Sequence, residues 1–375
     1  MTLYDRMADL PLRIDDWDLE RLEADTSSGF TRVTTVVSLS GDGTVGRGED
    51  VTYDVDEHDA LLDAADFDLT GEHTLDSFSA ALDDVDLFPA GDPDREAFFH
   101  YRRWGFESAA LDLALRQADT DLAAALDREY DPVRFVVSTR LDADVAQGDD
   151  ADGDGDGDPD GDGDEDAEPT AERVHEWLAI DPALEFKLDA TEDWTPDLVA
   201  DLAATDAVRI VDFKAHYEGT EVDGVPDPAL YRLVLDSLPG AIVEDPALTA
   251  ETDLVFEGRR DRISWDVPFV SAASLDALPF APTWLNVKPS RFGTVESLFS
   301  ALERCEREGI RLYGGGQFEL DVGRKHLHAL ASIFYPDGPN DVAPRGYNEP
   351  EPQSGLPTSP LPPPNDPVGL DWDGS

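Results

Sequence analysis

The 375-residue sequence predicts an α/β protein in which a barrel of alternating strands and helices follows an N-terminal α+β region. Three observations predict this class: short apolar segments recur, helical patterns lie between them, and polar residues cluster where the apolar segments end. The apolar segments are residues 133–141, 184–190, 207–215, 240–246, 262–268, 283–289 and 310–316. Such alternation favours parallel strands, and seven of them favour a closed barrel over a doubly wound open sheet, which is the alternative.

The residues before the barrel mix strand and helix patterns. Residues 30–40 are rich in β-branched side chains and typical of a strand, whereas the glycines of residues 41–50 indicate turns. Residues 56–68 and 75–88 carry apolar side chains at helical spacing, and residues 96–118 do so more strongly. These patterns predict one strand, a turn-rich segment and three helices.

Two segments differ in composition from the rest. Residues 148–169 form an Asp/Gly-rich run with twelve acidic residues. Their spacing lacks the Gly and Glu positions that a calcium loop requires, so we expect a solvated, acidic insertion in the barrel without a calcium site. Residues 346–375 are rich in proline and predict an extended C-terminal tail.

Charge and composition exclude several functions. The formal net charge is −56, so the protein should repel nucleic-acid phosphates and anionic lipid, and we expect neither as a partner. No apolar run is long enough to span a bilayer, and the N-terminal residues lack the basic and apolar regions of a signal peptide. The single Cys305 excludes an internal disulfide framework. We therefore expect a soluble, cytoplasmic protein.

Lysine is nearly absent from this acidic chain. Only Lys187, Lys214, Lys288 and Lys325 occur, and the other basic residues are arginines. Abundant acids with few lysines are typical of proteins from salt-loving archaea, which work in concentrated salt that screens charge repulsion. Arginine cannot act as a base at ordinary pH, whereas a buried lysine can. The remaining lysines are therefore candidates for chemistry.

Three of these lysines fall at the ends of predicted strands, among carboxylates. Alternation along a strand places Lys187 and Asp189 on one face, and likewise Asp212 and Lys214. Glu244, Asp266 and Lys288 end the following strands. Because Asp212, Glu244 and Asp266 lie on three successive strands, they should converge into an all-oxygen site, which suits Mg²⁺ better than zinc.

Several motifs resemble the enolase superfamily, in its mandelate racemase/muconate lactonizing branch. They are GRGED (46–50), ESAALDLALRQ (107–117), IVEDPA (242–247), LNVKPSRFG (285–293) and GGGQFELDVGRKHLHALAS (314–332). The resemblance implies an α+β capping domain over residues 1–95 and a TIM-type (β/α)₇β barrel over residues 96–345. It also implies that Asp212, Glu244 and Asp266 hold Mg²⁺, or Mn²⁺, and that the protein is a homo-oligomer.

The resemblance implies removal of the proton next to the carboxylate of a small substrate. The sequence departs from the family twice: Asp189 replaces the second lysine of Lys-x-Lys, and Lys214 replaces the asparagine of Asp-x-Asn. One interpretation is that the lysine has moved one strand over and pairs with Asp189. The base then remains open among Lys187, Lys214 and Lys288, with its pKa lowered by nearby Mg²⁺ and other cations.

Other polar residues receive secondary roles in this interpretation. Asp189, Gly315 and Glu319 are candidates for substrate contact, although Glu319 suits the first turn of a helix equally well. We expect His216, His326 and His328 to be structural, because none matches the histidine-base position of the family.

Two functions remain open from the sequence. The first is an Mg²⁺-dependent lyase or isomerase: a dehydratase, cycloisomerase, racemase or epimerase that forms an enolate. The alternative is a non-catalytic enolase-like barrel that binds carboxylates or regulates, having lost the base together with the Lys-x-Lys pattern.

The net charge makes a prediction about stability in salt. At about 0.01 M salt the Debye length grows to about 30 Å, so acidic groups across the whole surface repel one another. We expect the folded state to need on the order of molar KCl or NaCl, with the thermal midpoint falling steeply as salt is withdrawn. Thermal unfolding monitored by circular dichroism over a salt series tests this. Full stability in dilute buffer would contradict it.

Overall fold

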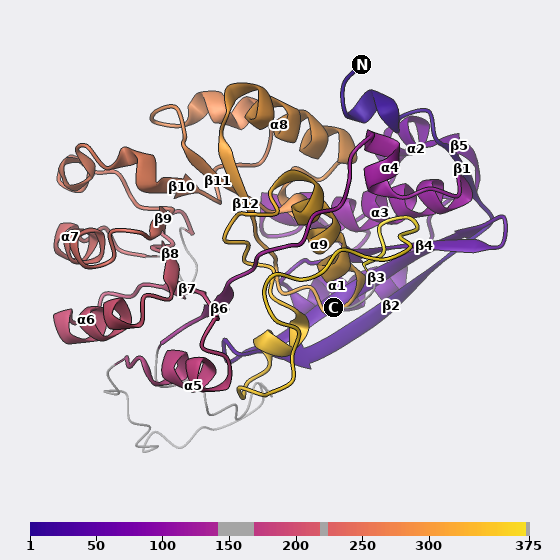
Figure 1. The fold of residues 1–375 in the computed structure, drawn as a ribbon. Helices are drawn as coiled ribbons and strands as arrows, with labels where there is room; N and C mark the ends of the chain where they lie inside the picture. The colour runs from indigo at the N-terminus through magenta and orange to yellow at the C-terminus, as the bar shows by residue number, and fades with distance from the viewer. Residues whose placement is uncertain (142–168, 218–223, 373–375) are drawn as a thin grey trace.

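In the computed structural model, residues 1–141, 169–217 and 224–372 are described (Figure 1). The predicted acidic insertion at 148–169 lies outside the described residues except for Pro169. Three antiparallel strands, β2 (Asp16–Asp25), β3 (Thr31–Gly41) and β4 (Thr44–Asp50), form the N-terminal sheet. A second, two-stranded sheet pairs β1 (Pro11–Ile14) with β5 (Gly71–Thr74). This region has the mixed α+β character that the sequence predicts.

The three predicted N-terminal helices are present. They are α1 (Val55–Ala64), α2 (Leu75–Leu82) and α3 (Glu96–Gln117). Thr74 begins α2 with a capping box, in which its side chain and that of Ser77 each accept the other's backbone N–H. The longest helix, α3, packs against β4 through closely approaching backbone and contacts the barrel at Val295, whose N–H donates to Glu107. It therefore connects the two regions.

The glycines of residues 41–50 make a turn only at the start of the segment, whereas the GRGED motif (46–50) lies at the end of a strand, as its resemblance to a capping-domain strand implies. Only Asp42 and Gly43, both with positive φ, turn the chain, and residues 44–50 form β4. Gly46 and Gly48 are in this strand because α3 lies on top of them. A Cβ atom at Gly48 would come within 2.0 Å of the carbonyl oxygen of Gly105. Gly46 and Gly48 thus permit close packing of a helix on a strand, whereas the sequence pattern predicts turns at the glycines of this segment.

All seven predicted barrel strands are confirmed and form one parallel sheet, ordered from β6 to β12 without a crossover. The strands are β6 (Val137–Thr139), β7 (Phe186–Asp189), β8 (Val208–Asp212), β9 (Ile242–Glu244), β10 (Ile263–Trp265), β11 (Trp284–Val287) and β12 (Arg311–Gly314). The helices beside them are α5 (Glu172–Ile180), α6 (Pro196–Thr205), α7 (Pro228–Ser237), α8 (Val295–Glu308) and α9 (Val322–Phe334). Short 3₁₀ turns replace helices after β9 and β10.

A segment after α9 links the two edges of this sheet. Asn340 forms a parallel bridge with Phe135, next to β6, and Asp341 forms one with Gly315, next to β12. The Asn340 side chain supports the link, because it accepts from the N–H of Gly314 at 2.7 Å and donates to the carbonyl of Arg134 at 2.8 Å. This short connection brings Asp341 to the same end of the sheet as the strand-end carboxylates.

The C-terminal tail is extended, as its proline content predicts. Leu361 bridges to Val133, and Gly369 bridges to Asp121, the N-cap residue of the short helix α4 (Leu122–Leu126). The N–H of Leu370 donates to Asp112 on α3, and Trp372 is buried. The tail therefore joins α3 to the start of the barrel.

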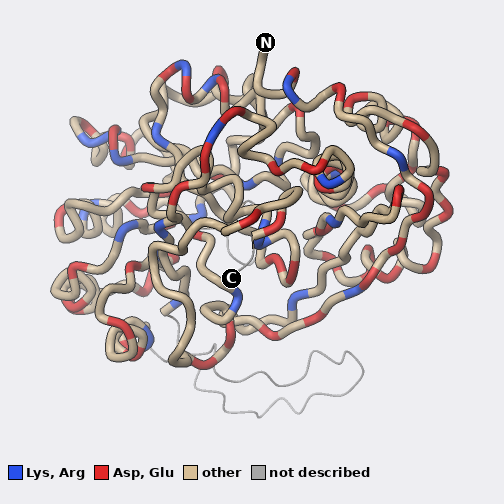
Figure 2. Tube along the Cα trace, turned by 45° about the vertical axis from the view of Figure 1, so that its right-hand side comes forward, with Lys and Arg blue, Asp and Glu red and all other residues tan. Residues whose placement is uncertain are grey.

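Acidic residues are spread over the whole chain, with basic residues scattered among them (Figure 2). This distribution agrees with the surface repulsion that the net charge of −56 implies. Within the described ranges, no helix has the length and apolar character needed to cross a membrane.

The packing of α3 on β4 makes a prediction. Gly48→Ala should lower the free energy of unfolding by about 1–3 kcal/mol or more, because the added methyl group collides with backbone rather than with a movable side chain. Gly240→Ala is the matched control, since a Cβ there meets nothing within 4 Å. Urea unfolding in high salt compares the two, and equal stabilities would contradict this packing argument.

Candidate active site

The strand-end carboxylates lie side by side, as predicted. The parallel register aligns Asp189 of β7 with Asp212 of β8, and Asp212 with Glu244 of β9. Asp266 follows β10, and it is fully buried together with Asp212 and Glu244. Parallel strands end at the same edge of a barrel, so the sequence places these three groups together through the register of the sheet.

Lys187 on β7 reaches the centre of this carboxylate cluster. Its side chain is buried, and its Nζ donates to Glu244 Oε1 at 2.6 Å. The same nitrogen lies 3.2 Å from Asp212 Oδ2 and 3.5 Å from Asp341 Oδ2. One ammonium group therefore neutralises carboxylates from three different strands or segments.

Lys214, directly after β8, confirms the predicted pairing with Asp189. Its Nζ lies 3.1 Å from Asp189 Oδ1 and donates to Asp212 Oδ2 at 2.6 Å. The backbone supports this position, because Lys214 has a positive φ of 50° and its N–H donates to Asp212 Oδ1 at 3.0 Å. The side chain that replaces the expected asparagine thus adds a second ammonium group at Asp212.

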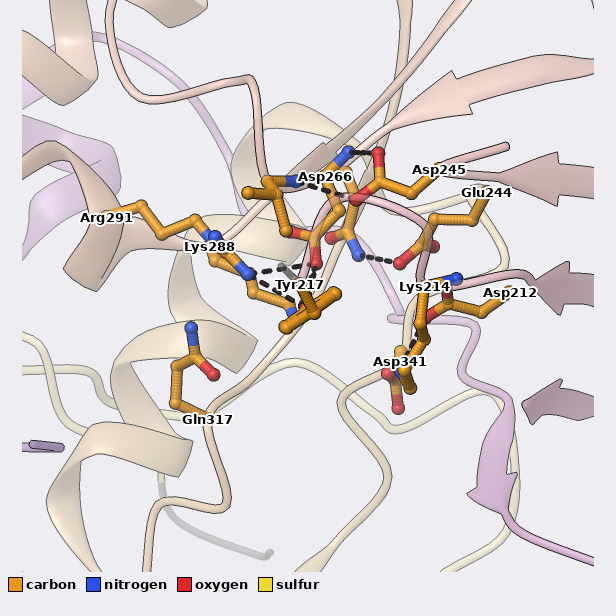
Figure 3. Close-up of polar contacts among 12 residues, drawn as sticks. Asp212, Lys214, Tyr217, Glu244, Asp245, Asp266, Lys288, Arg291, Gln317 and Asp341 are labelled. Atoms are coloured by element: carbon orange, nitrogen blue, oxygen red, sulfur yellow. Dashed lines mark hydrogen bonds and ion pairs between the residues drawn. The ribbon is translucent and has the colours of Figure 1, made fainter. Parts of the chain in front are cut away.

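A separate group of donors surrounds Asp266 (Figure 3). Its Oδ2 lies 2.9 Å from Lys288 Nζ and 3.1 Å from Arg291 Nη2. The hydroxyl of Tyr217 donates to the same oxygen at 2.9 Å. In Figure 3 these three side chains gather at Asp266, whereas Lys214 and Asp341 lie by Asp212, with Glu244 between the two groups.

Several of these residues were missed in the sequence. Tyr313, an apolar-looking member of β12, donates its hydroxyl proton to Glu244 Oε2 at 2.5 Å, and the Asn286 amide donates to Glu244 Oε1 at 3.2 Å. Arg291 lies within the LNVKPSRFG motif but after the strand, so strand alternation does not indicate where its side chain points. Asp341 follows β12 at about the spacing of the earlier strands, and that spacing is the one signal that would have found it.

The glycine-rich loop after β12 makes room for two side chains of the site. A Cβ at Gly315 would come within 2.5 Å of the Asn286 side chain and 2.9 Å of Lys288 Cε, so the glycine makes room for both. Glu319 accepts from the N–H of Gln317 and lies 3.4 Å from Arg324 of α9. Glu319 lies two residues before Asp321, the N-cap residue of α9, and not in the first turn of that helix.

Gln317 connects this loop to the N-terminal region. Its side-chain amide donates to the hydroxyl of Tyr101 at 3.1 Å and accepts from that of Tyr53 at 3.0 Å. Its carbonyl accepts from Arg32 Nε at 3.2 Å, and Phe30 packs edge-on against Phe318. The capping region therefore closes over the same end of the barrel as the carboxylates.

His328 has the structural role that the sequence predicts. It is fully buried, and its Nε2 bonds the carbonyl of Val342 at 2.6 Å. Burial lowers the pKa of His328 to about 3, so the ring is neutral. His216 packs against Trp265, with ring centroids 5.6 Å apart.

Without a bound metal ion, the carboxylates of the site raise the pKa of its lysines. Burial alone lowers the pKa of Lys187, but the carboxylates of Glu244 and Asp212 outweigh burial, and the pKa is raised well above its ordinary value. The pKa of Lys214 is raised in the same way by Asp189 and Asp212. The expectation that nearby Mg²⁺ and other cations lower the pKa of a base lysine concerns the metal-bound site. In this site the effect of the carboxylates on the lysine pKa exceeds that of burial, so the lysines are charged at neutral pH.

The carboxylates titrate differently from one another. Burial raises the pKa of Asp212, but Lys214 and Lys187 outweigh it and hold the pKa well below its usual value. For Glu244, burial and the nearby carboxylates prevail over Lys187 and raise the pKa to about 7. Asp245, which accepts the backbone N–H groups of Asp266 and Val267, has a pKa raised well above normal by burial and by its acidic neighbours.

These contacts test whether the site fits Mg²⁺. Within residues 1–141, 169–217 and 224–372, no set of three His, Cys, Asp or Glu side chains is arranged to hold a metal ion. Asp212 Oδ2 already has two ammonium nitrogens within 3.2 Å, and one of them also binds Glu244. Asp266 Oδ1 is buried without a hydrogen-bond partner among the described residues, but a single oxygen does not make a site. As arranged, the residues do not fit a divalent cation.

Comparison with known proteins gives the family and the fold. A protein-family model described as "Domain of unknown function (DUF8230) C-terminal domain" matches residues 129–349, and its N-terminal counterpart matches residues 5–125. No curated protein matches the sequence.

Solved structures of the enolase superfamily have the same fold. A superfamily member from Listeria innocua is 16% identical, with 96% of this chain and 95% of that chain covered at a TM-score of 0.63. Muconate cycloisomerase from Pseudomonas fluorescens is 16% identical, with 97% and 96% covered at a TM-score of 0.63. A dipeptide epimerase from Methylococcus capsulatus, complexed with Mg ion, is 19% identical, with 86% and 88% covered at a TM-score of 0.60. A capping region on a barrel of parallel strands is thus shown.

The position of Lys214 makes a prediction about metal affinity. Lys214→Asn removes an ammonium group 2.6 Å from Asp212, and with it the repulsion that an entering cation meets. We expect the variant to bind Mn²⁺ at least tenfold more tightly than the unchanged protein, measured by calorimetry in the same salt.

The control is Arg307→Gln, which removes a positive charge from a side chain that is 65% exposed and away from the site. The acidic segment is the same in all three proteins, so ions that it binds cancel in the comparison. Equal affinities for Lys214→Asn and the unchanged protein would show that Lys214 does not block the site.

Proposed function

The chain belongs to the family described as "Domain of unknown function (DUF8230)", and from this premise and the enolase-superfamily fold we propose that it is a lyase or isomerase. The proposed reaction is removal of the proton next to the carboxylate of a small substrate, giving an enolate. The similarity to structures of a muconate cycloisomerase and a dipeptide epimerase supports this reaction class without selecting one member of it.

One observation carries the proposal: three of the four lysines and Arg291 are collected at the strand ends, where they meet buried carboxylates. Buried ion pairs are seldom more stabilising than apolar residues of the same size, so stability alone does not account for this cluster. The cluster also contains three of the four lysines in a chain whose other basic residues are arginines. A chemical role accounts for both facts.

The cluster offers the charge that an enolate requires. A carbon acid beside a carboxylate is very weak, and fixed cations stabilise the negative charge that develops when the proton leaves. Lys288 and Arg291, both at Asp266, are suited to bind the substrate carboxylate, with the guanidinium forming paired hydrogen bonds. Lys187 and Lys214 supply two further cations at Asp212.

Mg²⁺ is the usual cation of this fold's chemistry, and one similar structure holds it. In this chain Mg²⁺ reaches Asp212 and Glu244 only if Lys187 and Lys214 withdraw from them. The proposal therefore assigns the charge-stabilising role to the lysines and Arg291. We also propose that the substrate is a small carboxylate and that the protein forms a homo-oligomer.

The base is one of Lys187, Lys214 and Lys288. A lysine removes a proton only when it is neutral, and carboxylate partners keep all three charged in the substrate-free site. The proposal therefore requires that a bound substrate separates one lysine from its carboxylate.

The same ion pairs favour a second function. If no lysine leaves its partner, the barrel binds a carboxylate through Lys288 and Arg291 and catalyses nothing. This is the carboxylate-binding or regulatory alternative.

Exchange of the α-proton with solvent deuterium separates the two functions. We expect the unchanged protein to exchange the α-proton of at least one probe among a 2-hydroxy acid, an N-acetyl amino acid and a dipeptide, followed by NMR. Conversion of Lys187, Lys214 or Lys288 to Arg keeps the charge and removes the base. At least one of these variants should lose exchange by 100-fold or more.

The control is Arg307→Lys, an exchange of cations on the exposed face of α8. It should retain the full rate. If a probe binds but no exchange occurs, the carboxylate-binding alternative holds; if all three Arg variants exchange at the unchanged rate, a lysine base is excluded.

A further inference from the structure

A cavity of about 210 Å³ lies away from the strand-end site, where four distant segments meet. β4 and α3 form part of its wall, and α9 and the C-terminal tail complete it; Figure 1 shows these elements next to one another. Its charged and polar lining residues are Arg47, Asp112, Arg116, Lys325, His326 and Asp371. The fourth lysine of the chain, which the active site does not use, is therefore in this cavity.

The two carboxylates of the cavity are already engaged. Asp112 Oδ1 accepts from Arg116 Nε at 2.9 Å and from the N–H of Leu370 at 2.8 Å, and its Oδ2 accepts from the N–H of Arg47 at 3.0 Å. Asp371 Oδ1 accepts from Lys325 Nζ at 3.1 Å. Asp112 thus holds β4, α3 and the tail together, and neither acid is available to receive a cation.

The guanidinium groups of Arg47 and Arg116 still have N–H donors available after these hydrogen bonds are formed. The guanidinium of Arg47 forms no ion pair with any residue that the structure describes, although it lines the cavity. Arg116 Nη2 approaches Asp371 only to 3.7 Å, beyond hydrogen-bond distance. Three cations face two carboxylates, which leaves a net positive charge in a chain of net charge −56.

His326 adds a neutral donor to the same wall. It is 3% exposed, and its Nδ1 has no hydrogen-bond partner among the described residues. Burial lowers its pKa to about 4, so the ring is uncharged at neutral pH and keeps one N–H. A buried ring nitrogen without a partner costs free energy unless a ligand or water satisfies it.

We propose that this cavity binds a small oxyanion, a carboxylate or a phosphate, between Arg47, Arg116, Lys325 and His326. Guanidinium groups bind such anions through paired, charge-assisted hydrogen bonds. The volume is below the roughly 300–1,000 Å³ of sites for larger organic ligands, so the anion has few carbon atoms. Because its ligands come from β4, α3 and α9, the anion ties the capping region to the barrel.

The test is calorimetric titration with inorganic phosphate and, separately, with malonate, at constant ionic strength. We expect saturable binding of at least one probe and a concentration-dependent rise of the thermal midpoint. Arg47→Gln and Lys325→Gln should each weaken binding at least tenfold. Arg47 has an exposed side chain, so this variant should keep the midpoint of the unchanged protein when no anion is added.

Two controls separate this cavity from other anion-binding surfaces. Arg307→Gln tests loss of one charge elsewhere and should keep the original affinity for both probes. Lys288→Gln tests binding at the strand-end site: it should keep the original affinity for phosphate, and any malonate binding that it removes belongs to the strand-end site. Preference for phosphate identifies a phosphate ligand, and preference for malonate identifies a small dicarboxylate. The proposal is overturned if neither probe binds saturably, if Arg47→Gln binds as tightly as the unchanged protein, or if only Lys288→Gln removes binding.

Discussion

The contact of Asp212 with two lysine ammonium groups is the interaction on which the rest of the site depends. Its Oδ2 lies 2.6 Å from Lys214 and 3.2 Å from Lys187, and Lys187 carries the contact on to Glu244. A carboxylate or an ammonium group left alone at this depth would cost several kcal/mol, so each is tolerable only because the other is present. This mutual neutralisation fixes which side chains β7, β8 and β9 can carry, and it leaves no free pair of oxygens between Asp212 and Glu244.

The capping region is constrained by the same end of the barrel. Glu49, at the end of β4, accepts the backbone N–H groups of Leu320, Asp321 and Gly323, where α9 begins. In most helices an N-cap side chain accepts the free N–H groups of the first turn. At α9 Glu49 fills this role from a distant part of the chain. Burial raises the pKa of Glu49, and the N–H groups act in the opposite direction. The loop that bears Gln317 is therefore held from both sides, by the cap and by its own helix.

Enolase-superfamily structures share this fold at 15–19% identity. The two departures at positions 189 and 214 are one change in physical terms, because the acid at 189 receives the lysine at 214. The lysine is shifted by one strand, and the total charge of the two positions falls from +1, for lysine and asparagine, to 0, for Asp189 and Lys214.

The sequence by itself determined the seven strands, the helix at 96–118 and the convergence of Asp212, Glu244 and Asp266, because apolar periodicity and parallel register are local and repetitive properties. The pairing of Asp189 with Lys214 is one interpretation of the sequence, and the structure confirms it. Only the tertiary structure decided that Asp341, Tyr313 and Arg291 complete the site, and that carboxylates raise rather than lower the pKa of Lys187. Those outcomes depend on distances between segments far apart in the chain, and a pKa is the balance of burial and every nearby charge, which no local pattern contains.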